Sequence, residues 1–218
     1  MALDKIQVPG DPRVRHCSTF VNGTTGGAIV YRIALYEPDF VTHVFSVCTP
    51  YWPPSKQYLS LEQTIAKIPF FGYQAQLANG GLEDILRSKE EIRQFLNAMY
   101  DVQPTHLLSE KEMDYYVNEF SRTGLHGPVS WYRTREQNWK DELEFLNESL
   151  DIPVLYILAT NDTALRPELS RNMERNIKHL TKAEVVASHW ALWESPEECN
   201  AHIKSWVEGV VFGGKVKL

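Results

Sequence analysis

The chain has 218 residues, of which 43% are hydrophobic, and a formal net charge of −6 at pH 7. A chain of this length can bury one full core, and its mild acidity argues against nucleic acid or an anionic membrane as a partner. The three cysteines, Cys17, Cys48 and Cys199, are scattered and form no Cys-x-x-Cys motif, which excludes a disulfide scaffold and a zinc finger.

The N-terminal residues lack the apolar segment of a secretory signal, and no apolar run approaches the ~18 residues of a membrane span. We therefore expect a cytoplasmic protein with no membrane span.

The chain begins with a polar segment, Met1–Arg15, followed by a short strand expected at Cys17–Val21. Residues Gly27–Tyr36 have helical periodicity, and Pro38 ends that helix. The β-branched run Val41–Val47 is typical of a buried parallel strand.

From residue 61 to about residue 140, every periodic segment is helical. Ser88 with Glu91, and Ser109 with Glu112, have the spacing of capping boxes. The helices expected in this block are Glu62–Ile68, Leu82–Leu86, Lys89–Met99, Glu110–Arg122 and Ser130–Asn138.

Strand character returns at Ile152–Ala159 and at Ala183–Ala187. A helix is expected between them at Pro167–His179, and a last helix at about Pro196–Val211. This alternation predicts a parallel sheet covered by helices on both faces.

The helical block interrupts this alternation, so we interpret it as an insertion. Three parts follow: the N-terminal part of an α/β core at residues 1–50, a helical lid at 51–145, and the C-terminal part of the core at 146–218.

Functional groups of parallel α/β sheets gather in loops at the carboxyl ends of strands. Three such loops are expected here: the turn Asn22–Gly27, a loop with Asp162 and a loop with His189. Turn residue, acid and histidine follow the chain order of a nucleophile–acid–histidine triad. A lone histidine such as His189 is more often structural, and Asp162 would also suit a helix N-cap before Leu165. However, each residue follows an expected strand at the matching place, and this favours a catalytic pair.

Several segments match, in order and in spacing, the epoxide hydrolases of the α/β-hydrolase fold: HVFSVCTPYWPPS, FFGYQ, HGPVSWYRTREQNWK, PVLYILATND and SHWALWESPEECN. The sequence resembles this family, in its fungal type, from about Gly26 to the C-terminus. The family has several strands and a His-Gly-x-Pro loop before this point. The resemblance therefore implies an N-terminally truncated member: a partial α/β-hydrolase fold, with half of the parallel sheet, flanking helices and an inserted all-helical lid.

The resemblance also implies roles for individual residues. Tyr73 and Tyr132 match the two lid tyrosines that bind the epoxide oxygen and donate a proton as the ring opens. Asp162 matches the acid that orients the histidine, and His189 the base that activates water. His126-Gly127-Pro128 is interpreted as a loop without a catalytic role. Residues expected to line the substrate pocket are Phe70, Trp131 and Trp190.

The family's nucleophile is the Asp of Gly-His-Asp-Trp-Gly-Gly. Aligning on Gly26-Gly27 places Thr24 at the position of this Asp, and a shift of one residue would place Thr25 there. A threonine hydroxyl has no charge at neutral pH and cannot form the alkyl-enzyme ester by simple attack. We therefore expect an epoxide hydrolase, adding water to an epoxide to give a vicinal diol, whose activity is impaired.

Two other interpretations stay open. One is a catalytically inactive remnant that binds an apolar ligand or pairs with another chain through an open sheet edge. The other is a haloalkane dehalogenase, which shares the fold and the aspartate nucleophile but lacks the paired lid tyrosines. Beyond a small apolar epoxide as substrate, we expect no metal ion, no cofactor and no nucleic-acid partner.

Overall fold

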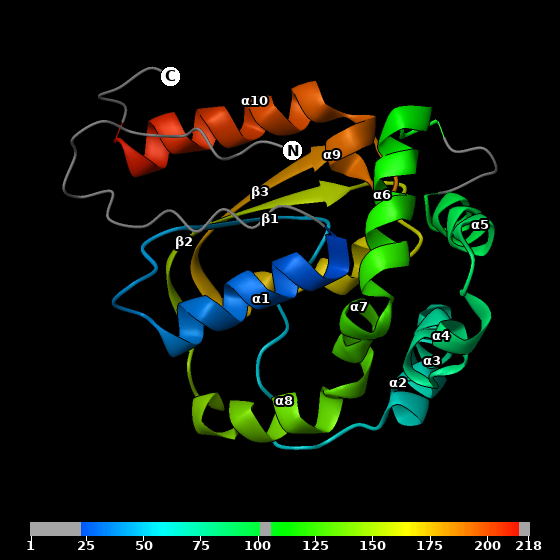
Figure 1. Ribbon diagram of the computed structural model, residues 1–218. Coiled ribbons are helices and arrows are strands. Elements are labelled where there is room, and N and C mark those ends of the chain that lie inside the picture. The colour runs from blue at the N-terminus through cyan, green and yellow to red at the C-terminus, as the bar shows by residue number, and fades with distance from the viewer. Residues whose placement is uncertain (1–22, 101–105, 214–218) are drawn as a thin grey trace. The chain divides into compact units, whose positions relative to one another are not determined.

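The computed structural model describes residues 23–100 and 106–213 (Figure 1). The chain divides into two compact units. The sheet unit comprises Met1–Pro54 with Phe145–Leu218, and the helical unit comprises Ser55–Glu144. The expected Met1–Arg15 segment, the Cys17–Val21 strand and Cys17 itself lie outside the described residues.

The sheet unit is built on three parallel strands in the order β1-β2-β3. These are β1 (Val44–Val47), β2 (Leu150–Ala159) and β3 (Ile177–Val185). Val47 lies opposite Ile157, and Ala159 lies opposite Val185. Because the strands are parallel, their carboxyl ends meet at one edge of the sheet, where functional loops of such sheets gather. The expected α/β fold with a parallel sheet is confirmed.

Two helices cover the sheet, α1 (Gly23–Tyr36) on one face and α10 (Pro196–Trp206) on the other (Figure 1). A π-helical turn, η6 (Val207–Val211), continues α10. The one-turn helix α9 (Ala191–Glu194) precedes α10. A core of fully or nearly buried side chains joins α1 to the sheet: Val30, Tyr31, Ala34, Leu35, Val41, Val44, Tyr51, Leu150, Val154, Tyr156, Met173 and Ile177.

Helix α1 begins at Gly23, not at Gly27 as expected, so the predicted turn Asn22–Gly27 is helical from its second residue. Gly27 is buried where the helix meets the end of β1. A Cβ atom there would lie 2.4 Å from Thr49 Cβ and 2.7 Å from Ser46 Oγ. Glycine at this position serves close packing of α1 on the strand rather than a turn.

The helix expected at Pro167–His179 is wrong. Two short 3₁₀ helices, η4 (Pro167–Ser170) and η5 (Met173–Arg175), stand there instead. Asn172, between them, has a left-handed backbone with φ 66° and ψ 15°, which a continuous α-helix does not tolerate. Strand β3 then begins at Ile177 rather than at Ala183, so His179 lies in the sheet.

The helical unit contains three capping boxes among its described residues. Those expected at Ser88 and Ser109 are confirmed, and a further box joins Ser60 to Gln63. The elements are α2 (Leu61–Lys67), η1 (Pro69–Phe71), α3 (Tyr73–Ala78), α4 (Gly81–Ile85), α5 (Lys89–Met99), α6 (Glu110–Thr123), α7 (His126–Ser130), η2 (Trp131–Arg133), α8 (Arg135–Asp141) and, at the junction with the sheet unit, η3 (Glu142–Phe145).

Two expectations for this unit are wrong. Residues His126-Gly127-Pro128 begin helix α7 and are not a loop, because Pro is tolerated in the first turn of a helix. The helix expected at Ser130–Asn138 is interrupted: α7 ends at Ser130, η2 follows, and α8 begins only at Arg135.

Helices α5 and α6 pack through a small core of their own: Ile92, Leu96, Leu108, Met113 and Val117. Among residues 23–100 and 106–213, no helix has the length and apolarity needed to cross a bilayer. In the same described ranges, no cluster of three or more His, Cys, Asp or Glu side chains is placed to hold a metal ion.

Candidate functional site

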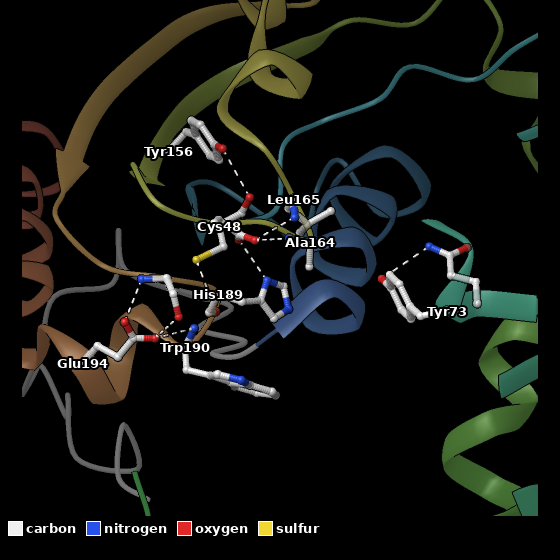
Figure 2. Close-up of polar contacts among 11 residues, drawn as sticks. Cys48, Tyr73, Tyr156, Ala164, Leu165, His189, Trp190 and Glu194 are labelled. Atoms are coloured by element: carbon white, nitrogen blue, oxygen red, sulfur yellow. Dashed lines mark hydrogen bonds and ion pairs between the residues drawn. The ribbon is translucent and has the colours of Figure 1, made fainter. Parts of the chain in front are cut away.

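The loops after β2 and β3 are joined by backbone hydrogen bonds that continue the ladder past the strand ends. Thr160 N donates to Val185 O, and Asn161 N donates to Ala187 O, each at 3.0 Å. This pairing brings Asp162 and His189, which lie just beyond, into contact. His189 Nδ1 and Asp162 Oδ2 are 2.9 Å apart (Figure 2).

The Asp162 side chain is fully buried, and its two oxygens have different partners. Oδ1 accepts hydrogen bonds from Ala164 N at 2.8 Å and from Leu165 N at 2.7 Å, which close the turn after β2 (Figure 2). Oδ2 faces the imidazole of His189. The carboxylate therefore fixes its own turn and holds the histidine at the same time.

The contact with Asp162 determines the tautomer of His189. An ionised carboxylate only accepts hydrogen bonds, so the proton shared with it is carried by His189 Nδ1. The side chain of His189 is 16% exposed. A neutral imidazole oriented in this way through Nδ1 has, at its other ring nitrogen, the chemistry of a general base for water.

Cys48, at the end of β1, supports the same loop from the sheet. Its backbone has a positive φ of 65°, and its N–H donates to Ile157 O at 2.9 Å. Its thiol donates to His189 O at 3.6 Å (Figure 2). Burial raises the pKa of the Cys48 thiol well above its usual range, so the thiol stays protonated as a donor.

Glu194 and Trp190 also contribute to the surroundings of His189. Glu194 accepts hydrogen bonds from Ser188 N at 2.7 Å and from Trp190 N at 3.1 Å (Figure 2). The Trp190 ring, a predicted pocket residue, lies 5.3 Å from the His189 ring, measured between centroids. Sequence reasoning missed Cys48 and Glu194, although Glu194 lies within the segment SHWALWESPEECN that carries the family resemblance.

In the helical unit, Tyr73 and Tyr132 are brought together. Tyr73 is the first residue of α3 and Tyr132 lies in η2. Their ring centroids are 6.5 Å apart with an interplanar angle of 80°. Burial, with a smaller contribution from Tyr73, raises the pKa of Tyr132 to about 12, so the phenol is a neutral donor at physiological pH.

A hydrogen-bonded chain leads from Tyr73 to a half-buried guanidinium. Gln74 Nε2 donates to Tyr73 Oη at 3.4 Å, and Arg135 Nη2 donates to Gln74 Oε1 at 3.3 Å. Arg135 Nη1 also donates to Thr64 Oγ1 at 3.1 Å. Burial lowers the pKa of Arg135. These bonds tie α2, α3 and α8 together beside the first tyrosine.

Arg133 fixes the second tyrosine's segment. Its Nε donates to Ala78 O, at the end of α3, at 3.1 Å. Its guanidinium forms an ion pair with Glu83, which also contacts His126 Nδ1 at 2.8 Å. Because Arg133 follows Tyr132 directly, these contacts hold η2 against α3 and α4.

The other predicted pocket residues are partly exposed. Phe70 contacts Phe71, and Phe71 contacts Tyr73, through rings 5.2 Å and 6.4 Å apart. Trp131 is the first residue of η2 and is half-buried. Thr24 has its backbone in the first turn of α1, and its side chain, like that of Thr25, lies outside the described part of the structure.

Residues 25–196 match the α/β-hydrolase fold family. The chain belongs to this family. Solved structures of similar fold include an epoxide hydrolase from Vigna radiata (TM-score 0.72, 18% identity, covering 84% of this chain and 66% of that one). Another is epoxide hydrolase I from potato (TM-score 0.71, 20% identity, covering 84% and 67%). At these identities the likeness shows the fold of this α/β-hydrolase.

Curated relatives of this α/β-hydrolase carry a more specific name. The chain is 36% identical to epoxide hydrolase srdG of Neurospora crassa, over 84% of this chain and 63% of the relative. It is 29% identical to bifunctional epoxide hydrolase 2 of Mus musculus, over 94% of this chain and 40% of the relative. The expected resemblance to epoxide hydrolases is confirmed, and the chain spans less than two thirds of these relatives' length.

Proposed function

We propose that this α/β-hydrolase is an epoxide hydrolase by descent, with water addition to an epoxide as its reaction and a strongly reduced rate. The observation that carries the proposal is the pair Asp162–His189, in which a buried carboxylate lies 2.9 Å from Nδ1 of the imidazole. The phenols of Tyr73 and Tyr132, whose ring centroids are 6.5 Å apart, support the same reaction, because opening an oxirane needs an acid for the departing oxygen.

The proposed chemistry uses these residues as acid and base. His189 Nε2 takes a proton from water while the water oxygen attacks an oxirane carbon. The carbon–oxygen bond of the ring breaks, and Tyr73 or Tyr132 donates a proton to the departing oxygen. Asp162 stabilises the imidazolium formed in this step. Return of the proton from His189 to the phenolate through solvent leaves a vicinal diol and the starting protein.

The reduced rate is attributed to Thr24. Covalent capture of the epoxide needs a carboxylate, and the alignment on Gly26-Gly27 places a neutral hydroxyl at that position. Removing a catalytic nucleophile lowers turnover by about 10⁶-fold in a serine protease. Direct attack by water avoids the covalent step, but it lacks the rate that a positioned carboxylate supplies.

A second candidate function is binding without turnover. It is favoured by the contiguous aromatic rings of Phe70, Phe71, Tyr73 and Tyr132 in the helical unit, which suit an apolar ligand. In this alternative the helical unit is a ligand-binding element rather than the lid of an enzyme. The same alternative includes pairing with another chain through an open sheet edge, which a measurement of the oligomeric state tests.

The experiment that separates the two is diol formation from styrene oxide. We expect slow turnover by the purified chain and its loss in the Tyr73→Phe/Tyr132→Phe double variant, because both acids for the epoxide oxygen are gone. Tyr115→Phe, at a tyrosine that is 64% exposed, is the matched control and should keep the rate. A cooperatively folded protein that releases no diol above the uncatalysed reaction would support binding alone.

The cause assigned to the reduced rate has its own test. Thr24→Asp restores a carboxylate, so diol formation should rise and an alkyl-enzyme ester should become visible by mass spectrometry. Thr24→Asn is the uncharged control of similar shape and should leave the rate unchanged. Equal rates for the Asp and Asn variants would contradict the assignment.

A further inference from the structure

Glu194 closes the loop that carries His189, and the reaction described above assigns it no part. It is the last residue of the one-turn helix α9, and its side chain turns back over the start of that helix. Oε2 accepts from Ser188 N at 2.7 Å and Oε1 accepts from Trp190 N at 3.1 Å (Figure 2). The Ser188 hydroxyl also donates to Oε1. The two backbone N–H groups flank His189 in the chain.

Other contacts fix the same loop from different sides. The ring of His189 is held by Asp162, and its carbonyl accepts the Cys48 thiol. The base of the loop is closed by Ser195 Oγ, which donates to Val186 O at 3.2 Å. Glu194 alone among these contacts acts on the backbone immediately before and after the histidine.

Such a contact matters for an acid–base residue on a loop. An imidazole keeps a hydrogen bond of 2.9 Å to Asp162 only if its own backbone has a single position. Backbone N–H groups at the start of a helix also favour a negative charge, so a carboxylate is a suitable group to hold them.

We propose that Glu194 is a positioning residue for His189. Its two carboxylate oxygens hold the backbone at Ser188 and Trp190, so that Nδ1 stays on Asp162 and Nε2 keeps one direction. As a statement about catalysis this rests on the proposed function, whereas the position of the ring is a property that can be measured without turnover.

The geometry specifies which substitutions preserve the contact. Both oxygens of Glu194 accept backbone hydrogen bonds. An amide has one acceptor oxygen, and its NH₂ group would oppose the N–H of either Ser188 or Trp190. Glu194→Gln therefore keeps one of the two backbone contacts, and Glu194→Ala keeps neither.

The test compares the intact chain with Glu194→Ala, Glu194→Gln and Glu197→Ala. Glu197 is an exposed carboxylate in the first turn of α10 and serves as the matched control. The readouts are the crystallographic position of the His189 ring, its ¹H–¹⁵N NMR signals, and amide exchange at Ser188 and Trp190. We expect one ring position in the intact chain and in the control. Glu194→Ala should show more than one ring position and about tenfold faster amide exchange, with Glu194→Gln between them.

A lower unfolding temperature alone would not support the proposal, since any loop contact contributes to stability. Glu194→Ala with a single ring position at hydrogen-bond distance from Asp162, and with unchanged ring signals and amide exchange, would overturn it. If the alanine variant does not fold, unchanged signals and exchange in Glu194→Gln would have the same meaning. Absence of diol formation by the intact chain, with the ring behaving as expected in the variants, would reject the proposed function and leave the positioning intact.

Discussion

Gly27 shows how one missing side chain determines the packing of α1 on the sheet. The space that a Cβ would need is occupied by Thr49 and by Ser46, whose hydroxyl donates to Thr49 O at 2.8 Å. The helix therefore lies closer to the end of β1 than any larger residue would allow, and the first turn of α1, with Thr24, is placed accordingly.

Gly27→Ala should destabilise the protein by about 1–3 kcal/mol, because the new methyl group overlaps Thr49 and the helix must move away. The measurement is the free energy of unfolding in urea. Gly209→Ala is the control, since a Cβ there meets no atom within 4 Å, and it should be neutral or stabilise by up to ~1 kcal/mol. Equal effects of the two substitutions would contradict the packing role of Gly27.

The sequence predicted part of the site at this scale. Asp162 and His189 were found from their places after two expected strands, and the structure brings them to 2.9 Å, while their catalytic roles stay predictions. Cys48 and Glu194 were missed because they act by side-chain contacts with backbone groups 141 and 6 residues away. Such contacts follow from the folded loops, and no periodicity or spacing rule in the chain indicates them.

At the scale of elements, the short helices around the two tyrosines are held by polar contacts between neighbours. Glu83 of α4 joins Arg133 of η2 to His126 of α7. The hydrogen bonds from Arg133 and then from His126 hold the pKa of Glu83 below its ordinary value of 4.5. Since the folded-state pKa is the lower one, this contribution to stability is present above about pH 4.5 and is lost as the pH falls through the folded-state value.

Glu83→Gln should therefore lower the unfolding temperature more at pH 7 than at pH 3, because the unsubstituted chain loses this contribution as its Glu83 carboxyl group takes up a proton on acidification. Thermal unfolding followed by circular dichroism at both pH values measures this. Asp84→Asn is the control, because the Asp84–Arg87 pair has side chains 80% and 73% exposed and contributes little. An equal effect of Glu83→Gln at both pH values would contradict the ion-pair role.

The elements themselves were predictable where local signals agree. Lys89–Met99 was predicted to the residue, because Ser88 caps the helix and the apolar face is periodic. Pro167–His179 failed because Asn172 takes a left-handed backbone and residues from Ile177 onward pair with β2. Pairing with a strand that is distant in the sequence overrides helix propensity, and the residue pattern of a short segment does not reveal it.

At the scale of the molecule, each unit has a core of its own. Leu96, 4% exposed, lies in the core between α5 and α6, whereas the core of the sheet unit gathers around α1, β1 and β2. The alternation of strands and helices predicted the parallel sheet, but the internal packing of the helical unit depends on which amphipathic faces meet. The hydrophobic periodicity of a single helix shows which of its faces is apolar, but not which other helix that face contacts.

Leu96→Ala should destabilise the helical unit by about 2–5 kcal/mol, because it leaves a cavity between α5 and α6. The rate of amide hydrogen exchange in peptides from α5 and α6, measured by mass spectrometry, should rise clearly. Ile85→Ala, at a side chain that is 64% exposed, is the control and should change stability by less than ~0.5 kcal/mol. Unchanged exchange in α5 and α6 for Leu96→Ala would show that this core does not hold the unit together.

The divided duty of Asp162 has a consequence for how this chain can evolve. Oδ1 of Asp162 closes the turn after β2 by accepting hydrogen bonds from Ala164 and Leu165, and this structural role does not depend on catalysis. Selection for correct folding alone would therefore preserve Asp162 even in a descendant that had lost catalytic activity. In such descendants we expect substitutions to accumulate first at His189, because its replacement leaves the turn closed, and only later at Asp162.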